Sequence, residues 1–150
     1  MTLHITTNSS AETMALGRRF AAVLTAGDVV LLSGSLGAGK TVFASGIAEG
    51  LGISDRITSP TFVISRIHTG GFLRFVHADV YRLGSVAEFE DLEITDDALD
   101  GVVVIEWGDA VAESLAPDFI TIHIEVDGDR RSFRFEPNGS WKTRSLEMLT

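Results

Sequence analysis

The chain has 150 residues, a formal net charge of −9 and no cysteine. This length fits one compact domain with a substantial core, so we expect a single domain over residues 1–150. The lack of cysteine excludes disulfides, cysteine-ligated zinc and a thiol nucleophile.

The acidic charge argues against strong autonomous binding of nucleic acid. Only Lys40 and Lys142 are lysines, and the arginines are scattered, whereas tight binding needs clustered basic residues that release counterions. No apolar run approaches the roughly 20 residues that cross a membrane. The first residues also lack the basic start and apolar stretch of a signal peptide. We therefore expect a cytoplasmic protein with no membrane partner.

The first third of the chain predicts a helix, a strand and a second helix. Ser9 with Glu12 three residues later is typical of a capping box, and the helix that follows ends at Ala26-Gly27. Its apolar positions have helical spacing: Leu16, Phe20, Val23 and Leu24. The apolar run 28–33 predicts a buried strand, and residues 40–51 predict the second helix.

The middle of the chain predicts further strands. Residues 62–69 and 72–79, joined by Gly70-Gly71, read as a β-hairpin. The acidic stretch 85–100 is typical of one or two short exposed helices. The all-apolar run 102–105 predicts another buried strand.

The last third predicts a second hairpin and a final helix. Apolar residues alternate with polar ones over 120–126, as in a half-exposed strand. A turn at 127–129 leads to a similar alternation over 132–135. Residues 141–149 are predicted to form a helix.

A glycine-rich loop follows the first buried strand. Residues 34–41 match the pattern G-x-x-x-x-G-K-[ST] in full, in which backbone N–H groups and a helix N-terminus cradle phosphates. Lys40 is expected to reach the β- and γ-phosphates, and the Thr41 hydroxyl to bind Mg²⁺. The predicted nucleotide-binding residues are Gly34, Ser35, Leu36, Gly37, Ala38, Gly39, Lys40, Thr41 and Val42. The sequence therefore predicts a Mg²⁺-dependent ATPase with an α/β fold: a P-loop NTPase-like sheet, mixed parallel and antiparallel, flanked by helices.

Two carboxylates are candidates to complete this site. Glu106 directly follows the strand 102–105, and Asp79 ends the run 73–79, where period two places His77 on the same face. Both strands could bring their carboxylates to the edge of the sheet where open α/β proteins bind ligands. We favour Glu106 as the metal ligand, directly or through water. Asp79 would then position the attacking water or support the metal shell, although the two roles could be exchanged.

Ser59-Pro60-Thr61-Phe62 lies between the second helix and the hairpin. In P-loop switch proteins such a stretch orders around the γ-phosphate and Mg²⁺ through a hydroxyl. Thr61 is the candidate for this catalytic role. The alternative is a plain proline turn.

Four motifs in this order resemble the bacterial TsaE (YjeE) family. They are the loop 34–41, Ser59-Pro60-Thr61-Phe62, His77-Ala78-Asp79-Val80-Tyr81-Arg82-Leu83 and Ile105-Glu106-Trp107. The glycine-rich loop alone is unspecific, but the combination is specific. One departure is Gly108, where many relatives carry proline after the Glu-Trp pair.

The resemblance implies an ATPase required for the N6-threonylcarbamoyladenosine modification at position 37 of tRNA. Family members act with TsaB and TsaD, and the resemblance implies that hydrolysis drives a conformational or turnover step in that complex. Carried over, Lys40 and Thr41 match the phosphate and Mg²⁺ positions, Glu106 a metal-coordinating glutamate, and Asp79 an acidic residue important for hydrolysis. Thr61 belongs to the switch-like segment. The tRNA would be contacted mainly through TsaB and TsaD.

Two other functions remain open from the residues. A small P-loop kinase acting on a nucleoside or metabolite would need an acceptor pocket and usually a lid bearing arginines. The sequence shows no arginine-rich lid, although Arg74 and Arg82 could contribute to one. A nucleotide-sensing adaptor would bind ATP without turnover. Slow hydrolysis by the isolated protein is expected, since no arginine finger is evident.

Contacts to the adenine base are less defined. The segment around Thr6 and Thr7 and the pair Arg130-Arg131 are candidates, or ordinary surface features. His4, His68 and His123 lack metal-ligand spacing and are expected at exposed positions.

Overall fold

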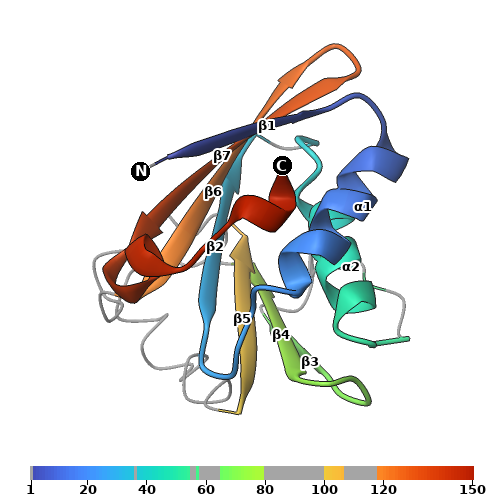
Figure 1. The fold of residues 1–150 in the computed structure, drawn as a ribbon. Helices are drawn as coiled ribbons and strands as arrows, with labels where there is room; N and C mark the ends of the chain where they lie inside the picture. Colours follow the sequence, from blue (N-terminus) through green and yellow to red (C-terminus); the bar gives the residue numbers. More distant parts are fainter. Residues whose placement is uncertain (1, 36, 55–56, 58–64, 80–99, 107–117) are drawn as a thin grey trace.

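The computed structural model describes residues 2–35, 37–54, 57, 65–79, 100–106 and 118–150. These residues form a seven-stranded sheet with two α-helices packed against one face (Figure 1). The strands are β1 (Leu3–Thr7), β2 (Val29–Gly34), β3 (Ser65–His68), β4 (Arg74–Asp79), β5 (Gly101–Glu106), β6 (Phe119–Asp127) and β7 (Arg130–Asn138). The helices are α1 (Ser10–Ala21) and α2 (Lys40–Gly50), followed near the C-terminus by the 3₁₀ helices η3 (Gly139–Thr143) and η4 (Glu147–Leu149).

The sheet is mixed, with β2 near its centre. The strand order is β1-β7-β6-β2-β5-β4-β3. β2 pairs in parallel with β5 and β6, and β4 pairs in parallel with β5. β1, β7 and β3 pair antiparallel with their neighbours. The predicted mixed α/β fold is confirmed, and the carboxyl ends of β2, β5 and β4 meet at one edge of the sheet.

Helix α1 begins as its sequence predicts. The Ser9 side-chain oxygen accepts a hydrogen bond from the Glu12 backbone N–H at 3.1 Å, which satisfies one of the free donors at a helix start. Leu16 and Phe20 are fully buried, and the Phe20 ring lies 5.8 Å from the Phe43 ring and 6.0 Å from the Trp141 ring. An aromatic core therefore joins α1, α2 and the C-terminal segment.

Helices α1 and α2 approach each other through glycines. A Cβ added at Gly17 would lie 2.5 Å from the Phe43 carbonyl oxygen, and one added at Gly46 would collide with the Met14 carbonyl oxygen. Only glycine permits this close approach of two backbones. The contact fixes α2, whose first residue is Lys40.

Some predictions about local structure are wrong. Residues 141–149 do not form one helix, because Arg144 is extended (φ −79°, ψ 131°) and separates η3 from η4. Strand β1 was not predicted. His68 is buried at 8% exposure and packs 5.9 Å from the Phe75 ring, and His123 is half-buried.

The hairpin of β3 and β4 is confirmed, as are the strands β2, β5, β6 and β7. The predicted helices within 85–99 lie outside the described residues.

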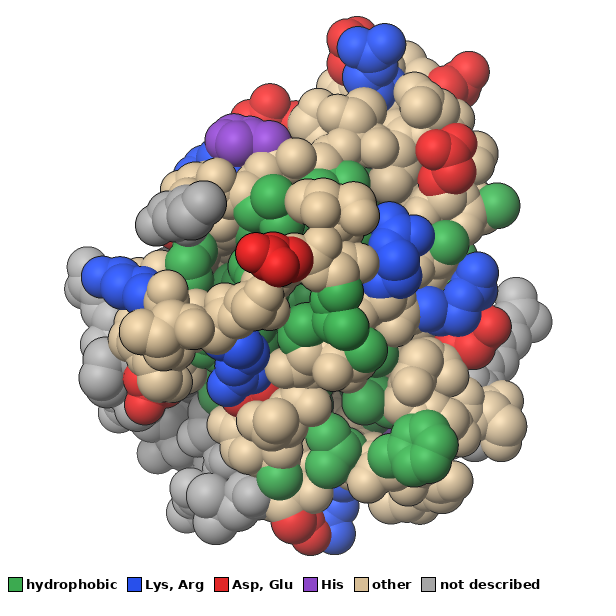
Figure 2. Space-filling model, in the orientation of Figure 1, with side chains coloured by type: hydrophobic (Ala, Val, Ile, Leu, Met, Phe, Trp, Pro, Cys, Tyr) green, Lys and Arg blue, Asp and Glu red, His purple; other side chains and the backbone are tan. Residues whose placement is uncertain are grey.

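No helix in the described part of the chain is long and apolar enough to cross a membrane. On the face seen in Figure 2, Lys and Arg side chains stand apart in several places with Asp and Glu among them.

Candidate functional site

The glycine-rich loop joins β2 to α2 at the edge of the sheet where the parallel strands end. Gly37 and Gly39 have φ angles of +81° and +103°, a left-handed conformation that side chains disfavour. Within the loop, the Ala38 N–H donates to the Ser35 carbonyl at 3.0 Å. The two glycines therefore provide the backbone conformation that the motif requires.

The N-terminus of α2 faces this loop without a side-chain cap. Gly39 is the N-cap residue and makes no side-chain hydrogen bond. The first N–H groups of a helix have no partner within the helix, and the helix dipole adds positive potential at this end. Together these groups suit a phosphate.

Lys40 lies against the loop. It is 4% exposed, and its Nζ donates to the carbonyl oxygens of Gly34 at 2.8 Å and Ser35 at 2.9 Å. Burial lowers the pKa of Lys40 from its ordinary 10.5, and the negative charges of Glu106 and Asp79 offset part of this shift. The ammonium group and both predicted carboxylates thus share one electrostatic environment.

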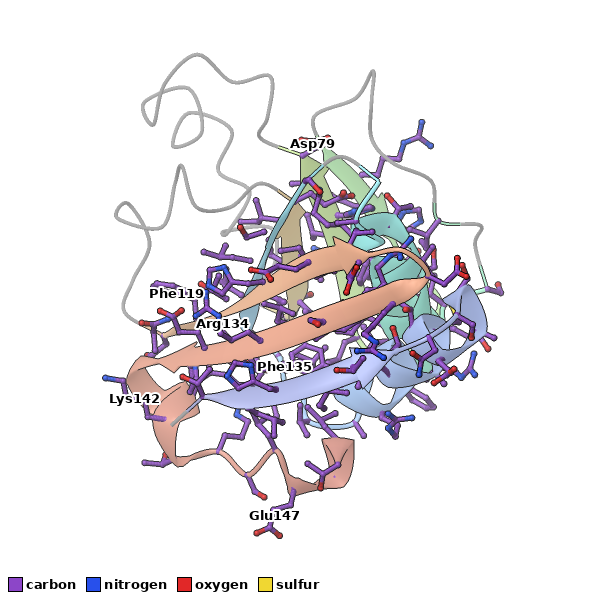
Figure 3. The ribbon with its side chains drawn as sticks, turned by 90° about the horizontal axis from the view of Figure 1, so that it is seen from above. Asp79, Phe119, Arg134, Phe135, Lys142 and Glu147 are labelled. Carbon is purple, nitrogen blue, oxygen red and sulfur yellow. The ribbon has the colours of Figure 1, made fainter. Side chains whose placement is uncertain are left out.

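The two carboxylates end neighbouring parallel strands. Asp79 is the last residue of β4 and Glu106 the last of β5, and the two are paired in the register. Figure 3 shows Asp79 at the end of β4. Glu106 is 3% exposed, and its Oε2 lies 2.6 Å from His77 Nε2. The sequence placed each residue at a strand end but did not reveal the contact between His77 and Glu106.

The oxygen donors of this region fit Mg²⁺. The predicted ligands are the Thr41 hydroxyl at the start of α2 and the Glu106 carboxylate, with Asp79 beside Glu106 in the sheet. Mg²⁺ prefers oxygen ligands and is commonly held by one or two carboxylates together with substrate phosphates and water. In the described part of the chain, no group of three or more His, Cys, Asp or Glu residues could hold a metal ion.

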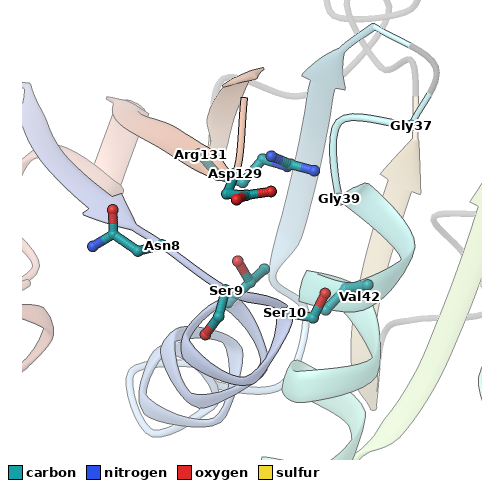
Figure 4. Close-up of a pocket in the computed structure, with 9 residues that line it drawn as sticks. Asn8, Ser9, Ser10, Gly37, Gly39, Val42, Asp129 and Arg131 are labelled. Atoms are coloured by element: carbon teal, nitrogen blue, oxygen red, sulfur yellow. The ribbon is translucent and has the colours of Figure 1, made fainter. Parts of the chain in front are cut away.

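A cavity of about 430 Å³ opens beside the loop. Three segments that are far apart in the sequence surround it (Figure 4): residues 8–13 before and within α1, residues 37–42, and the turn between β6 and β7. Its lining consists of Asn8, Ser9, Ser10, Thr13, Gly37, Gly39, Val42, Asp129 and Arg131. Its size is in the range of small-molecule sites.

Arg131 is the positively charged residue of the lining. Its Nη1 donates to the Gly128 carbonyl at 2.8 Å, and its Nε lies 3.8 Å from where a Cβ on Gly39 would be. In Figure 4 the guanidinium group points toward the loop. The Arg131 side chain is therefore held close to the N-terminus of α2.

Of the residues predicted to contact adenine, one lines the cavity and another is buried away from solvent. Arg131 lines the cavity, whereas Thr7 is buried in β1 and its hydroxyl bonds to the Thr13 hydroxyl at 2.7 Å. The polar lining from the N-terminal part of the chain comes instead from residues 8–10 and Thr13. The sequence did not indicate that these residues or Asp129 line a cavity. The available signal was Ser9, which was correctly predicted as the N-cap of α1 and lies in the same short segment. Leu36, Thr61 and Trp107 lie outside the described residues.

Comparison with known proteins gives consistent matches. Residues 7–133 match the family model "Threonylcarbamoyl adenosine biosynthesis protein TsaE". The chain is 49% identical over 113 residues to the Streptomyces coelicolor tRNA threonylcarbamoyladenosine biosynthesis protein TsaE, covering 73% of this chain and 76% of that protein. It is 42% identical over 119 residues to the protein of the same name from Bacillus subtilis, covering 79% and 74%. The crystal structure of Bacillus subtilis YdiB superposes with a TM-score of 0.81 at 32% identity, covering 99% of this chain and 94% of that one.

Proposed function

The chain belongs to the TsaE family, and we propose that it is a Mg²⁺-dependent ATPase of tRNA threonylcarbamoyladenosine biosynthesis. It acts as one domain in a complex with TsaB and TsaD homologues, where hydrolysis drives a conformational or turnover step. The relatives' names support the pathway. The site geometry supports the chemistry.

One observation carries the ATPase proposal. The glycine-rich loop, the buried Lys40 and the carboxylates Asp79 and Glu106 converge at the carboxyl edge of the parallel strands. A phosphate cradle next to two carboxylates is the arrangement that phosphoryl transfer uses, because catalysis depends on positioning and charge stabilisation.

Each residue has a role in this scheme. Backbone N–H groups of the loop and of the start of α2 bind the β- and γ-phosphate oxygens. The Lys40 ammonium exchanges its bonds to the Gly34 and Ser35 carbonyls for bonds to phosphate oxygens. Mg²⁺, when bound, supplies positive charge that offsets the charge developing on the phosphates.

The remaining residues hold the metal and the water. The Thr41 hydroxyl and the Glu106 carboxylate hold the metal, and Asp79 orients the attacking water. Thr61 contributes from the switch-like segment. Exchanging the roles of Asp79 and Glu106 would leave the reaction class unchanged.

The cavity next to the loop is proposed to receive the nucleoside part of ATP. It continues from Gly37 and Gly39 toward residues 8–10 and Arg131, so a nucleotide with its phosphates in the loop would extend into it. The charge of −9 suits a subunit that leaves most tRNA contact to its partners.

The test is ATP hydrolysis by the purified protein with and without TsaB and TsaD, with Lys40→Ala as the blank. We expect slow hydrolysis alone, stimulation by the partners and loss of nucleotide affinity in the variant. Glu106→Ala should retain nucleotide binding and lose mainly Mg²⁺-dependent turnover.

Other outcomes would redirect the assignment. Normal turnover in both variants would refute the site. Hydrolysis indifferent to the partners, with phosphate transferred to a nucleoside or metabolite, would favour a kinase. Tight ATP binding without turnover, even in the complex, would favour an adaptor.

A further inference from the structure

His77 and Glu106 form a buried polar pair between β4 and β5. His77 is fully buried, and its Nε2 lies 2.6 Å from Glu106 Oε2. In the register, His77 is opposite Val104 and Asp79 is opposite Glu106, so His77 and Glu106 are diagonal neighbours on the same face. This arrangement lets the imidazole reach across to the carboxylate from the strand that also ends in Asp79.

The polar contact of His77 is directed at Glu106. Among the described residues, its other ring nitrogen, Nδ1, has no hydrogen-bond partner. The ring packs 5.9 Å from the Phe75 ring at an angle of 48°, which restricts its orientation. A carboxylate that binds a metal ion is ionised and can only accept hydrogen bonds, so a metal-binding Glu106 requires Nε2–H as the donor in this 2.6 Å contact.

We propose that His77 is a positioning residue that orients the Glu106 carboxylate toward the bound Mg²⁺. This inference rests on the proposed function, because it assumes that Glu106 binds the metal. With Oε2 held by His77, Oε1 would be the oxygen left to bind the metal. Outer hydrogen bonds of this kind fix the direction of a ligand, and their loss typically weakens metal affinity roughly 10- to 100-fold.

A purely structural role is the competing explanation. A buried carboxylate needs hydrogen-bond donors to offset its lost hydration, and any donor would serve that purpose. Such a role predicts losses in stability with no selective effect on the metal. The positioning role therefore predicts a change in metal affinity, whereas the structural role predicts a change in stability.

The variants His77→Gln and His77→Asn separate these explanations. Both introduce a neutral amide, but glutamine extends its nitrogen to about the position of Nε2, whereas asparagine is one carbon shorter. The measurements are Mn²⁺ affinity by electron paramagnetic resonance in the presence of ADP, ADP affinity in EDTA, and Tm. We expect His77→Asn to weaken Mn²⁺ binding by at least about tenfold, with ADP affinity in EDTA unchanged and His77→Gln close to the wild type.

Nuclear magnetic resonance of the wild-type protein supplies a readout that does not depend on the variants folding. The ¹⁵N shifts of the His77 ring should show a proton on Nε2. A ring protonated only on Nδ1 would overturn the inference, as would Mn²⁺ affinities that are unchanged in His77→Asn or reduced equally in both variants in step with Tm.

The failure of the proposed function is distinguishable from these results. If Mn²⁺ fails to bind the wild-type protein with ADP, or if Glu106→Ala binds Mn²⁺ as the wild type does, the assignment of Glu106 as metal ligand is wrong. In that case the positioning role of His77 is refuted together with the assignment of Glu106.

Discussion

Glu136 on β7 is held by two neighbouring side chains on the sheet face opposite the helices. Its Oε2 lies 3.0 Å from His123 Nε2 and accepts a hydrogen bond from Arg134 Nη1 at 2.9 Å. Burial opposes ionisation, but the contacts with His123 and Arg134 outweigh it and lower the pKa of Glu136 below its ordinary 4.5. The ionised form is therefore favoured more in the folded chain than in the unfolded one.

The lowered pKa of Glu136 predicts that its contribution to the stability of the fold depends on pH. A carboxylate with a lowered pKa stabilises the fold above its unfolded pKa, and the contribution is lost as the pH falls through the folded pKa. Glu136→Gln should therefore have a lower Tm than the wild type at neutral pH, and the difference should narrow below pH 4.5. Thermal unfolding across this range checks it.

Glu125→Gln is the matched control, since Glu125 is an exposed carboxylate on the neighbouring strand β6. Its Tm should equal that of the wild type at each pH. A difference between Glu136→Gln and the wild type that is independent of pH would show that the ionised contacts do not cause it.

At the level of elements, the crossing of α1 and α2 connects the fold to the phosphate loop. Gly17 and Gly46 bring the two backbones together, and α2 begins at Lys40 directly after the loop. The position of the helix that supplies phosphate-binding N–H groups thus depends on a glycine contact two turns away from the loop.

Gly46→Ala should destabilise the protein although alanine is the better helix former. Its Cβ would collide with the Met14 carbonyl, and overpacking of this kind typically costs about 1–3 kcal/mol. Urea unfolding measures the loss. Glu49→Ala on the same helix removes only the exposed 3.2 Å ion pair with Arg18 and should cost about 0–1 kcal/mol. Equal stability of Gly46→Ala and the wild type would contradict the packing argument.

Most elements near the loop were predictable because their sequence signals are local. Apolar runs gave β2 and β5, and the Ser9–Glu12 cap gave the start of α1. The contact between His77 and Glu106 was not predictable, because it depends on the order of strands in the sheet. That order is set by tertiary packing, which a single sequence does not display.

The C-terminal segment was mispredicted for a related reason. Trp141 and Leu149 are both buried, and their spacing resembles one face of a helix. The chain is instead extended at Arg144, whose guanidinium reaches Asp28, a residue far away in the sequence. A long-range contact here overrides the local pattern, as it does for β1, which exists through its pairing with β7.

For the whole molecule, Arg144 ties the C-terminal segment to the start of the central strand. Its Nη1 and Nη2 donate to the Asp28 carboxylate at 2.6 and 3.1 Å, and Nη1 also donates to the Val23 carbonyl at 3.1 Å. The guanidinium stacks 3.8 Å from the Trp141 ring centre. Residues beyond 133, where the family match ends, therefore contribute to the core.

Arg144→Lys should lower the free energy of unfolding by about 1–3 kcal/mol, because a lysine cannot make the two parallel bonds or stack in the same way. Urea unfolding provides the measurement. Lys142→Arg changes an exposed residue of the same segment and should leave stability unchanged. A wild-type unfolding curve for Arg144→Lys would show that the contact contributes little.

The pairing of β1 with β7 also has a consequence for how the chain folds during synthesis. Leu3–Thr7 pairs with 131–135, so β1 is synthesised long before the strand with which it pairs. Until then, Phe20 of α1 lacks the rings of Phe135 and Trp141, which pack against it in the folded protein. Chains with such distant partners expose apolar surface while they grow. The nascent protein is therefore a candidate for chaperone binding until β7 and Trp141 have emerged.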